Sequence, residues 1–499
     1  MLSRIRQLKW DLRSARYLCA ISLVLLPIAL NAMSLRDGHN IGDDFAQYII
    51  CAQNILSGKP YSQGVMLGLP VIFPPAYSLV LAPFIFFFGV NFLILKSLNI
   101  VFMALLVWGA YRTAKGRAGQ VRAYFAALFI AWMSYFFFHN QNIISDLPFS
   151  TVAVWAVYYL ERYDVRSRSR DMWRSAGLMS LALLTRSAGT ALFLGALIYR
   201  ILSRQGQHRG RDLLALVAVF CATVIFQNSF FGSAPGVWSA IIHYAFWIPM
   251  IILNKLFYIS PALLWVIVPP YTGLNSALYA YPLVFPFLSG ALVLVFTGAF
   301  IWQAIRRSLT PLFAIFFVYF SLVVLWTVTY EGHVENFSRF MLPAVPLLIV
   351  WIMDVLARYH SLTLHSLARA LFLLFFVLNV WNVICVRDFS DDVTRDPEMQ
   401  GLVAWVKTHV AQDEGVLFFR PRFLSLMAGV KSGVGGNHED EISEQWLAEN
   451  NIRYAVTFRR VDCIISRLIA SRPYLFELEW KNREYRAYRF TGFKRSASP

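Results

Sequence analysis

Long apolar stretches separated by short clusters of Arg and Lys recur through the first 386 residues of the chain. A helix needs about 20 mostly apolar residues to cross a bilayer, so the pattern predicts a polytopic α-helical membrane protein. We expect about 11 crossings, two of them short helices of one hairpin. The expected spans are Tyr17–Leu35, Ser97–Tyr111, Tyr124–Phe138, Leu147–Leu160, the two arms between Arg174 and Arg200, Asp212–Phe231, Tyr279–Ile305, Leu312–Tyr330, Phe340–Leu356 and Leu367–Val386.

The basic clusters give these spans a direction, because Lys and Arg accumulate on the cytoplasmic side of a membrane. The first span follows five basic residues between Arg4 and Arg16 and has no good A-x-A cleavage site. It is therefore expected to be an uncleaved anchor with a cytoplasmic N-terminus. The proline-containing stretch Val71–Gly89 either crosses the membrane or lies on its outer surface. A crossing would place the basic loop Arg112–Arg122 outside, so the pattern favours the outer surface.

A hairpin of two short helices is predicted between the basic clusters that end at Arg174 and begin at Arg200. Both clusters should be cytoplasmic, and the connecting segment is too short for two full spans. Its tip falls at Thr185-Arg186-Ser187. Arg186 would then be a charge held within the membrane region, which is a functional-site hypothesis in itself.

The stretch Gly42–Tyr61 follows the first span and begins with two adjacent carboxylates, Asp43 and Asp44. Apolar positions after them recur at helical spacing, and Ser57-Gly58-Lys59-Pro60 ends the predicted helix. Two interpretations remain open for the acidic pair. The carboxylates either cap a helix N-terminus or belong to a site at the outer face.

The periodicity changes after residue 386, and the last 113 residues contain 33 charged ones. This tail predicts a separate α/β domain outside the membrane, so we place the domain boundary between residues 386 and 387. Within 1–386, residues 36–96 should form an outer-face loop with juxtamembrane helices. Helices are expected at Glu398–Val410 and Ile442–Glu449, and strands at Val416–Phe419, Tyr454–Phe458, Tyr474–Glu479 and Tyr485–Phe490.

Composition agrees with a membrane location and argues against nucleic acid. The chain is 58% hydrophobic and 15% charged, and its net charge is +17. Soluble domains are usually about 25% charged. From residue 387 onward, 17 basic residues face 16 acidic ones, so the excess positive charge lies between the membrane spans. The five cysteines show neither a disulfide framework nor zinc-ligand spacing.

The predicted topology separates the charged residues by side. Six carboxylates before the tail face outward, and so do six cations, whereas the other acidic residues lie beside cytoplasmic basic clusters and should be solvated or ion-paired. The outward residues are Asp37, Asp43, Asp44, Asp146, Glu331 and Glu335, with Arg36, Lys59, Lys96, Arg186, Lys255 and Arg339. A few carboxylates beside a few cations suit a general base that faces an anionic leaving group.

Several residues retain a structural interpretation. Asp146 could cap its span, and Arg339 could be an interface anchor. His333 and His438 are interpreted as loop residues, because no second ligand lies at metal spacing. No cofactor is predicted with certainty, and a divalent metal remains open.

Five motifs in order resemble the GT-C membrane glycosyltransferases that use polyprenyl-phosphate-linked sugars, in particular bacterial relatives of protein mannosyltransferases and of the lipid A aminoarabinose transferase. The motifs are Asp43-Asp44 with Tyr48 and Gly58, FPPAYSLVLAPFIFFFG from Phe73, Ser145-Asp146-Leu147-Pro148-Phe149, LALLTRSAG around Arg186, and Ser338-Arg339-Phe340 with Pro343 and Pro346. The α/β domain after the last span also fits. Asp44 departs from the pattern, since relatives often have Glu there, and this leaves the subfamily open.

The resemblance implies a role for each candidate residue. Asp43 would be the base that deprotonates the acceptor hydroxyl, and Asp44 and Asp146 would orient it or bind acceptor. Arg186, Arg339 and Lys59 would hold the lipid phosphate, and Tyr48 and Tyr61 would contact substrate. The implied partners are a polyprenyl-phosphate-linked sugar and a lipid, glycan or protein acceptor at the outer face of a bacterial-type inner membrane.

Two other functions remain open. A transporter or flippase of lipid-linked glycans should show pseudo-repeats with broken helices in both halves, and the sequence shows neither. A ligase would transfer a large lipid-linked glycan in place of one sugar, so donor size separates it from the transferase.

Overall fold

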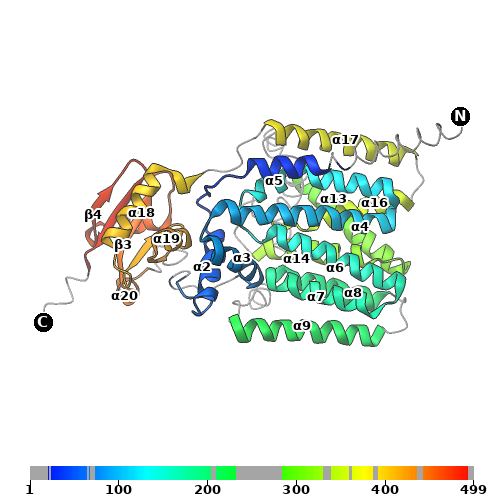
Figure 1. Ribbon diagram of the computed structural model, residues 1–499, viewed down its shortest axis with the longest axis horizontal. Coiled ribbons are helices and arrows are strands. Elements are labelled where there is room, and N and C mark those ends of the chain that lie inside the picture. The colour runs from blue at the N-terminus through cyan, green and yellow to red at the C-terminus, as the bar shows by residue number, and fades with distance from the viewer. Residues whose placement is uncertain are drawn as a thin grey trace.

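A bundle of long helices and a smaller domain built on a β-sheet make up the computed structural model (Figure 1). The structure describes residues 21, 24–64, 67, 73–203, 209–231, 284–329, 339–358, 362–385, 392–434 and 442–492. The stretch Ser233–Leu274, whose many aromatic and proline residues predict irregular structure at the outer membrane interface, lies outside them. The main bundle helices are α4 (Phe92–Trp132), α5 (Ser134–Asn140), α6 (Asp146–Arg166), α7 (Ser169–Thr185), α8 (Thr190–Leu202), α9 (Arg209–Phe231), α13 (Val284–Ile305), α14 (Pro311–Thr329), α16 (Ala344–Arg358) and α17 (Leu362–Cys385).

Helix α4 contains an expected span, the basic turn after it and most of the next expected span. Its backbone is helical except at Gly119, where φ of 82° and ψ of 171° interrupt the helix. The side chain of Asn99 donates to the carbonyl oxygens of Asn140 at 3.3 Å and Asn142 at 2.8 Å. Residues on either side of Gly119 therefore meet, and the chain reverses there with its basic residues near the turn, as the pattern predicted.

Helices α7 and α8 form the predicted hairpin, with a short 3₁₀ turn, η1 (Ser187–Gly189), between them. Arg186 ends α7 with extended backbone dihedrals, φ −152° and ψ 141°. The turn packs closely on α7, because a Cβ atom on Gly189 would lie 2.4 Å from the backbone nitrogen of Leu183. Only glycine fits at this approach, and the tight tip holds Arg186 at the end of the hairpin.

Three helices of the described chain are long and apolar enough to cross a membrane by length and composition: α4, α9 and His365–Ile384 within α17. Several shorter apolar helices accompany them, among them Val24–Ser34 and α3 (Ala76–Phe88). At 13 residues, α3 is shorter than the roughly 20 residues that a crossing needs. Its length agrees with a juxtamembrane location, whereas the total of about 11 crossings remains a prediction.

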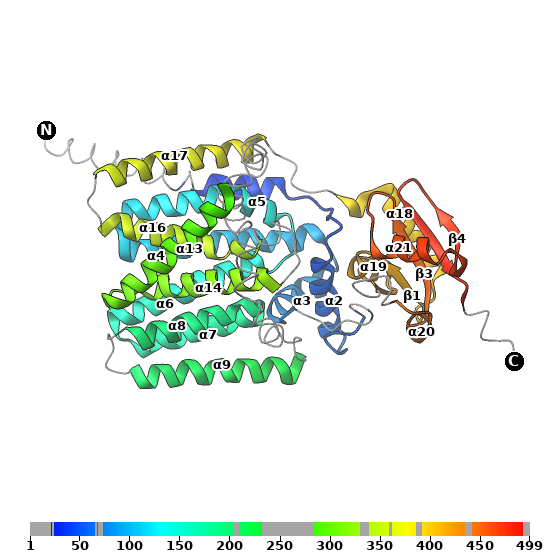
Figure 2. The ribbon, with the colours of Figure 1, turned by 180° about the vertical axis from the view of Figure 1, so that it is seen from behind.

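Helices α2 (Asp44–Leu56) and α3 lie between the long helices and the sheet domain, which both views show (Figures 1 and 2). The face of α2 toward its neighbours is apolar, with Phe45, Ile49 and Ala52 buried. The acidic start of this helix is therefore brought to the end of the bundle that faces the C-terminal domain.

The C-terminal domain contains a five-stranded sheet in the order β2-β1-β3-β5-β4. Strands β2, β1 and β3 are parallel to one another, while β3, β5 and β4 are antiparallel. The strands are β1 (Gly415–Phe418), β2 (Lys431–Gly433), β3 (Ile452–Phe458), β4 (Phe476–Lys481) and β5 (Tyr485–Phe490), and the helices are α18 (Pro397–His409), α19 (Pro421–Ala428), α20 (Glu444–Glu449) and α21 (Ile464–Ser471). Each predicted element of the tail has a counterpart, whereas α19, β2 and α21 were not predicted.

One hydrophobic cluster joins α2 and α3 to the C-terminal domain. It includes Phe45 and Tyr77 on one side and Met399, Phe418 and Phe423 on the other. The rings of Phe45 and Phe423 meet edge to face, with centroids 6.0 Å apart. Burial of apolar surface on both sides holds the sheet domain against the acidic start of α2.

Candidate functional site

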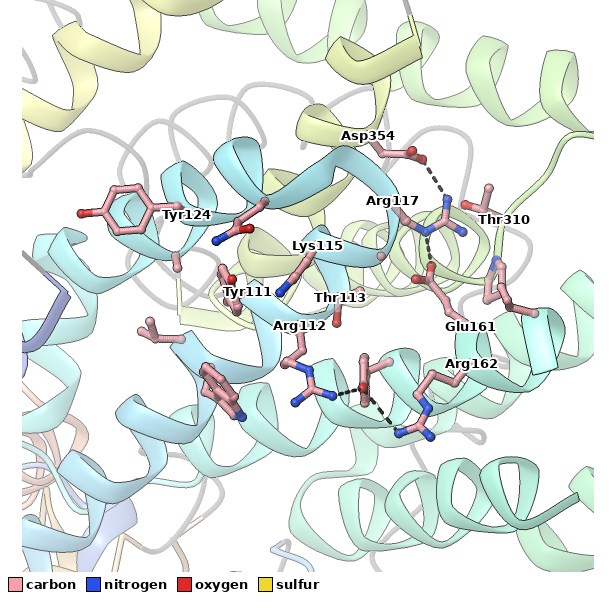
Figure 3. Close-up of a pocket in the computed structure, with 18 of the residues that line it drawn as sticks. Tyr111, Arg112, Thr113, Lys115, Arg117, Tyr124, Glu161, Arg162, Thr310 and Asp354 are labelled. Atoms are coloured by element: carbon pink, nitrogen blue, oxygen red, sulfur yellow. Dashed lines mark hydrogen bonds and ion pairs between the residues drawn. The ribbon is translucent and has the colours of Figure 1, made fainter. Parts of the chain in front are cut away.

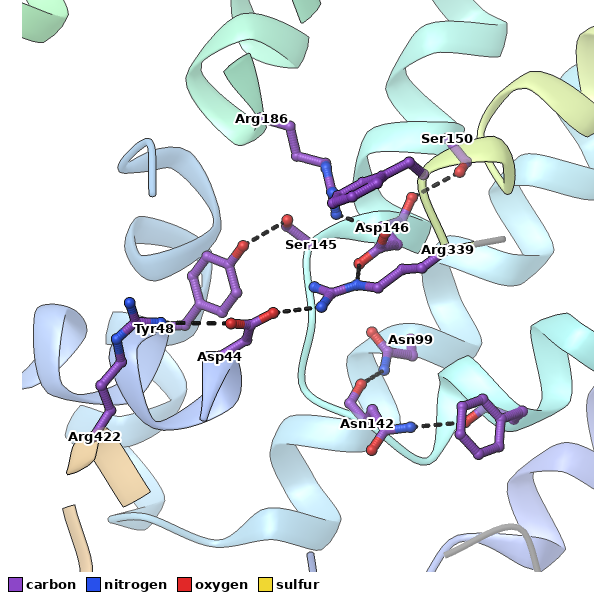
Figure 4. A network of polar contacts seen from close by, with 12 residues as sticks. Asp44, Tyr48, Asn99, Asn142, Ser145, Asp146, Ser150, Arg186, Arg339 and Arg422 are labelled. Atoms are coloured by element: carbon purple, nitrogen blue, oxygen red, sulfur yellow. Dashed lines mark hydrogen bonds and ion pairs between the residues drawn. The ribbon is translucent and has the colours of Figure 1, made fainter. Parts of the chain in front are cut away.

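Six charged side chains converge where the bundle meets the C-terminal domain, and Figure 4 labels all of them except Asp43. They come from segments far apart in the sequence: the start of α2, the start of α6, the break between α7 and α8, the turn before α16, and α19. The residues are Asp43, Asp44, Asp146, Arg186, Arg339 and Arg422.

The charges alternate along this cluster. Arg186 Nη1 lies 2.6 Å from Asp146 Oδ1, and Arg339 Nε lies 2.9 Å from Asp146 Oδ2. The other end of the Arg339 guanidinium donates from Nη1 to Asp44 Oδ2. Arg422 Nη1 lies 3.5 Å from Asp44 Oδ1, and Arg422 Nε lies 3.7 Å from Asp43 Oδ2. Arg339 thus bridges two carboxylates, and Arg422 reaches both members of the acidic pair.

The carboxylates hold the arginines without using all of their donors. A guanidinium has five N–H groups. Among the described residues, Arg186 forms an ion pair with Asp146 alone, and its charged centre lies 5.6 Å from the centroid of the Phe340 ring. Asp146 is fully buried, so the pairs are shielded from water. The arrangement presents fixed, partly unused N–H donors, which suit an anionic oxygen.

Asp43 stands at the N-cap of α2, but its side chain makes no capping hydrogen bond. Its Oδ1 instead accepts from the backbone N–H of Phe423 at 3.0 Å, and Oδ2 lies 3.7 Å from Arg422, beyond hydrogen-bond distance. Burial raises the pKa of Asp43, and the nearby Arg422 and the Phe423 N–H only partly oppose this. Asp43 is thus the least neutralised carboxylate of the cluster, and a raised pKa makes it a stronger base.

In Asp44, the effect of neighbouring arginines on the pKa is stronger than the effect of burial. Burial acts to raise its pKa, but the attraction of Arg339, the hydrogen bond from that residue and the attraction of Arg422 outweigh burial and leave the pKa lowered. Asp44 is therefore held as an ion-paired carboxylate. Two neighbouring residues at a helix start point about 100° apart, and this difference in direction gives the pair two different environments.

Tyr48 extends the site on the side of α2. Its hydroxyl lies 2.6 Å from the Oγ atom of Ser145, the residue that precedes Asp146 in the sequence. The ring stacks on Phe73 and meets Tyr77 edge to face, each with a centroid distance of 4.9 Å. The aromatic packing connects α2 to α3 and the segment before it, and the hydroxyl contact connects α2 to the start of α6. Together these contacts fix Asp44 and Asp146 relative to each other.

Other predicted residues do not join the cluster. The side chain of Lys59 lies exposed in the turn after α2, with no ion pair to a described residue. The Tyr61 hydroxyl donates to the carbonyl oxygen of Phe73 at 3.3 Å and lies 3.3 Å from Ser78 Oγ. Lys96 is buried and donates to the carbonyl oxygens of Arg36, at 3.0 Å, and Gly38. Asp37 is half-exposed and pairs with Arg395 at 2.6 Å. The other outward candidates, Lys255, Glu331 and Glu335, lie outside the described residues, as do His333 and His438.

Arg422 and the backbone N–H of Phe423, which both belong to α19, were not predicted from the sequence. The only local signal is Pro421 at the first position of that helix, and proline is favoured there. Nothing in the spacing links α19 to α2, because the contact spans about 380 residues of chain.

A metal site is not evident in the described part of the chain: no group of three or more His, Cys, Asp or Glu side chains there could hold an ion. Within the cluster, the Arg339 guanidinium lies between Asp44 and Asp146 and pairs with both. These carboxylates face a cation that the chain itself supplies.

Residues 73–230 match the family model described as dolichyl-phosphate-mannose-protein mannosyltransferase. Among solved structures, ArnT from Cupriavidus metallidurans in the apo state is 13% identical and superposes with a TM-score of 0.57. The alignment covers 95% of this chain and 98% of ArnT. The same protein bound to undecaprenyl phosphate gives a TM-score of 0.57 at 12% identity, with coverage of 94% and 97%. The chain has the GT-C fold.

Two further structures share this fold. The Archaeoglobus fulgidus oligosaccharyltransferase tethered with an acceptor peptide is 11% identical and has a TM-score of 0.54. The alignment covers 88% of this chain and 69% of the oligosaccharyltransferase. The mycobacterial arabinofuranosyltransferase AftD is 12% identical and has a TM-score of 0.52, and the alignment covers 94% of this chain and 41% of AftD. No curated protein matches the sequence significantly. The family match and the GT-C fold confirm the predicted resemblance to polyprenyl-phosphate-dependent enzymes and the predicted enzyme class, a glycosyltransferase.

Proposed function

We propose that this GT-C glycosyltransferase transfers one sugar from a polyprenyl-phosphate donor to an acceptor hydroxyl, at the outer face of a bacterial-type inner membrane. The observation that carries the proposal is the alternating cluster of carboxylates and arginines at one end of the bundle. It places a weakly paired carboxylate and fixed guanidinium groups on neighbouring elements. Transfer to a hydroxyl from a phosphate leaving group needs both.

Asp43 is the proposed general base. Its Oδ2 makes no hydrogen bond to a described residue, so it can accept the proton of the acceptor hydroxyl. The acceptor oxygen then forms a bond to the anomeric carbon as the bond from that carbon to the phosphate oxygen breaks. Attack from the face opposite the leaving group inverts the anomeric configuration.

Arg186 and Arg339 are the proposed phosphate ligands. The departing polyprenyl phosphate keeps the electron pair of the broken bond, and two guanidinium groups stabilise the added charge. Asp44 and Asp146 hold these arginines in place and orient the acceptor. Tyr48 and Tyr61 are the proposed substrate contacts. Lys59 is a third proposed phosphate ligand. ArnT is similar over nearly the whole chain and has been solved with undecaprenyl phosphate, which supports a lipid-phosphate donor here.

Donor binding tests these assignments separately from chemistry. Losing one charged hydrogen-bond partner costs roughly 1.5–3 kcal/mol, so Arg186→Gln and Arg339→Gln should each weaken binding of undecaprenyl phosphate about tenfold or more. Lys59→Gln in the same assay tests the third proposed ligand. Arg489→Gln, on an exposed position of β5, is the matched control. Unchanged affinity in both cluster variants would leave Arg186 and Arg339 as structural anchors.

The transferred group is identified by mass spectrometry of envelope lipids, glycans and proteins from cells with and without the gene. A transferase predicts the loss of a mass increment of one sugar, restored by the wild-type gene and not by Asp43→Asn. Loss of a whole polymer would indicate a ligase. Donor lipid that accumulates unflipped, with purified protein inactive in transfer, would indicate a flippase.

A further inference from the structure

A cavity of about 1700 Å³ lies at the opposite end of the bundle from the carboxylate–arginine cluster and shares no residue with it. Residues of the helix Val24–Ser34, both arms of α4, α6 and α16 surround it. Figure 3 shows Arg112, Lys115, Arg117 and Arg162 around this space, with Glu161 and Asp354 beside Arg117. Nothing in the proposed transfer reaction uses it.

The cavity is more strongly basic than its composition first suggests. It is lined by three acidic residues, Glu161, Asp164 and Asp354. Each is already neutralised: Arg117 lies 2.5 Å from Glu161 and 2.9 Å from Asp354, and Arg200 lies 2.7 Å from Asp164.

Four lining cations have no carboxylate partner among the described residues: Arg112, Lys115, Arg166 and Arg307. Arg112 and Lys115 are three positions apart on α4 and so lie on the same helix face. Arg112 donates to the hydroxyl of Tyr158 at 2.7 Å, and the Lys115 ammonium lies 5.6 Å from the ring of Tyr111. Aromatic rings thus position both cations without neutralising them.

The same cavity has an apolar wall. Ile21, Leu25, Trp108, Val121 and Phe125 line it and are between 41% and 69% exposed. Exposed apolar side chains at the end of a membrane bundle face lipid chains and not water. A ligand here would meet cations at one end and hydrocarbon-compatible surface at the other.

We propose that this cavity binds the phosphodiester headgroup of an anionic phospholipid, whose acyl chains lie along the apolar wall. Guanidinium and ammonium groups bind phosphate oxygens by charge-assisted hydrogen bonds, and basic pockets between spanning helices bind such headgroups. The lining carboxylates cannot repel the phosphate strongly, because each one is paired with an arginine of the same chain. A soluble phosphate would gain nothing from the apolar wall, and this favours a lipid as the ligand.

The test measures lipid retained by the purified full-length protein, by native mass spectrometry after exposure to dioleoyl phosphatidylglycerol or dioleoyl phosphatidylcholine. Wild type should retain the anionic lipid preferentially. The double variant Arg112→Gln with Lys115→Gln should retain it at least about tenfold less, since two charged donors are lost. The matched control is Arg168→Gln with Arg170→Gln, which removes two exposed cations that do not line the cavity. It should retain the lipid as wild type does.

Lys115→Glu guards against a folding artefact, because this side chain is exposed. It should lose anionic lipid with an unchanged thermal unfolding midpoint. Equal retention of the two lipids by wild type would overturn the proposal, and so would an equal loss in the control. Displacement of phosphatidylglycerol by inorganic phosphate alone would show that the ligand is a soluble phosphate and not a phospholipid. Preferential retention of undecaprenyl phosphate would show that the ligand is an isoprenoid phosphate. Each readout is independent of transfer activity, so it can fail while the proposed function stands.

Discussion

Asp43 and Asp44 are neighbours in the chain but have different electrostatic surroundings. Asp44 pairs with Arg339 and Arg422, whereas Asp43 accepts one backbone hydrogen bond and lies near Arg422 without a hydrogen bond to it. The pKa of Asp43 is raised by burial, and that of Asp44 is lowered because its arginines outweigh burial. At the scale of single residues, this difference supports the proposal that Asp43 is the base and that Asp44 has a positioning role.

Asp43→Asn is expected to lower the transfer rate at least about 100-fold, since removal of a general base costs roughly 10²–10⁴-fold. The variant keeps size and should still fold and bind donor, as measured by undecaprenyl phosphate binding. Asp44→Asn should be damaged less and partly through binding. Asp37→Asn, which alters an exposed ion pair with Arg395, is the control and should remain active. Near-normal transfer by Asp43→Asn, together with an Asp146→Asn variant that is folded but inactive, would move the base to Asp146.

Asp146→Asn is expected to destabilise the protein by about 3–5 kcal/mol, because it removes the buried ion-pair partner of Arg186 and one of the two carboxylates that pair with Arg339. The measurement is the thermal unfolding midpoint in detergent. Asp37→Asn serves again as the comparison, since exposed pairs contribute about 0–1 kcal/mol. Equal midpoints for the two variants would show that the cluster contributes little to stability.

Two elements, α19 and the break in α4, have roles that cannot be predicted from their own sequences. Helix α19 brings Arg422 and the Phe423 N–H to Asp43, so the C-terminal domain helps to set the properties of the proposed base. The break in α4 at Gly119 lets two helical arms pack back on each other. Each element can be tested through one substitution.

Arg422→Gln is expected to shift the pH dependence of transfer. A base acts only when deprotonated, so activity is lost as pH falls through its pKa, and in wild type this pKa is already above the usual 3.8. Arg422 acts to lower the pKa of Asp43, so its removal should raise the pKa further and move the acid limb of kcat/KM to higher pH. A contact that only held the domain in place would lower activity equally at every pH.

Gly119→Ala is expected to destabilise the protein, because φ of 82° with ψ of 171° is accessible essentially to glycine alone. The cost should be of order 1–3 kcal/mol. Gly116→Ala is the matched control, in the same helix with open space around its Cβ position, and should be neutral or stabilising by up to about 1 kcal/mol. Both are measured as unfolding midpoints, and the same midpoint for the two variants would contradict a reversal at Gly119.

On the scale of the whole molecule, charged side chains gather at both ends of the bundle. The carboxylate–arginine cluster and the C-terminal domain are at one end, and the basic cavity is at the other. Direct packing of Phe423 on Phe45 requires the C-terminal domain and the acidic pair to be on one side of the membrane.

A reporter that is active only outside the cytoplasm, fused after Pro499, is therefore expected to be active. The same reporter inserted after Arg168, in the basic end, should be silent. A silent and well-expressed fusion at Pro499 would mean that the predicted number of crossings is wrong by one.

The sequence alone determined the membrane class, the hairpin tip at Arg186, the turn near Arg112–Arg122 and most elements of the tail, because apolar run length, charge clusters and periodicity are local properties. The glycosyltransferase class came from motifs in their order along the chain. Tertiary structure decided which charges meet. Arg339 bridges Asp44 and Asp146, and Arg422 reaches Asp43, only because helix packing brings together segments that are hundreds of residues apart. Such pairing depends on directions and distances in space, and a linear pattern of residues does not contain them.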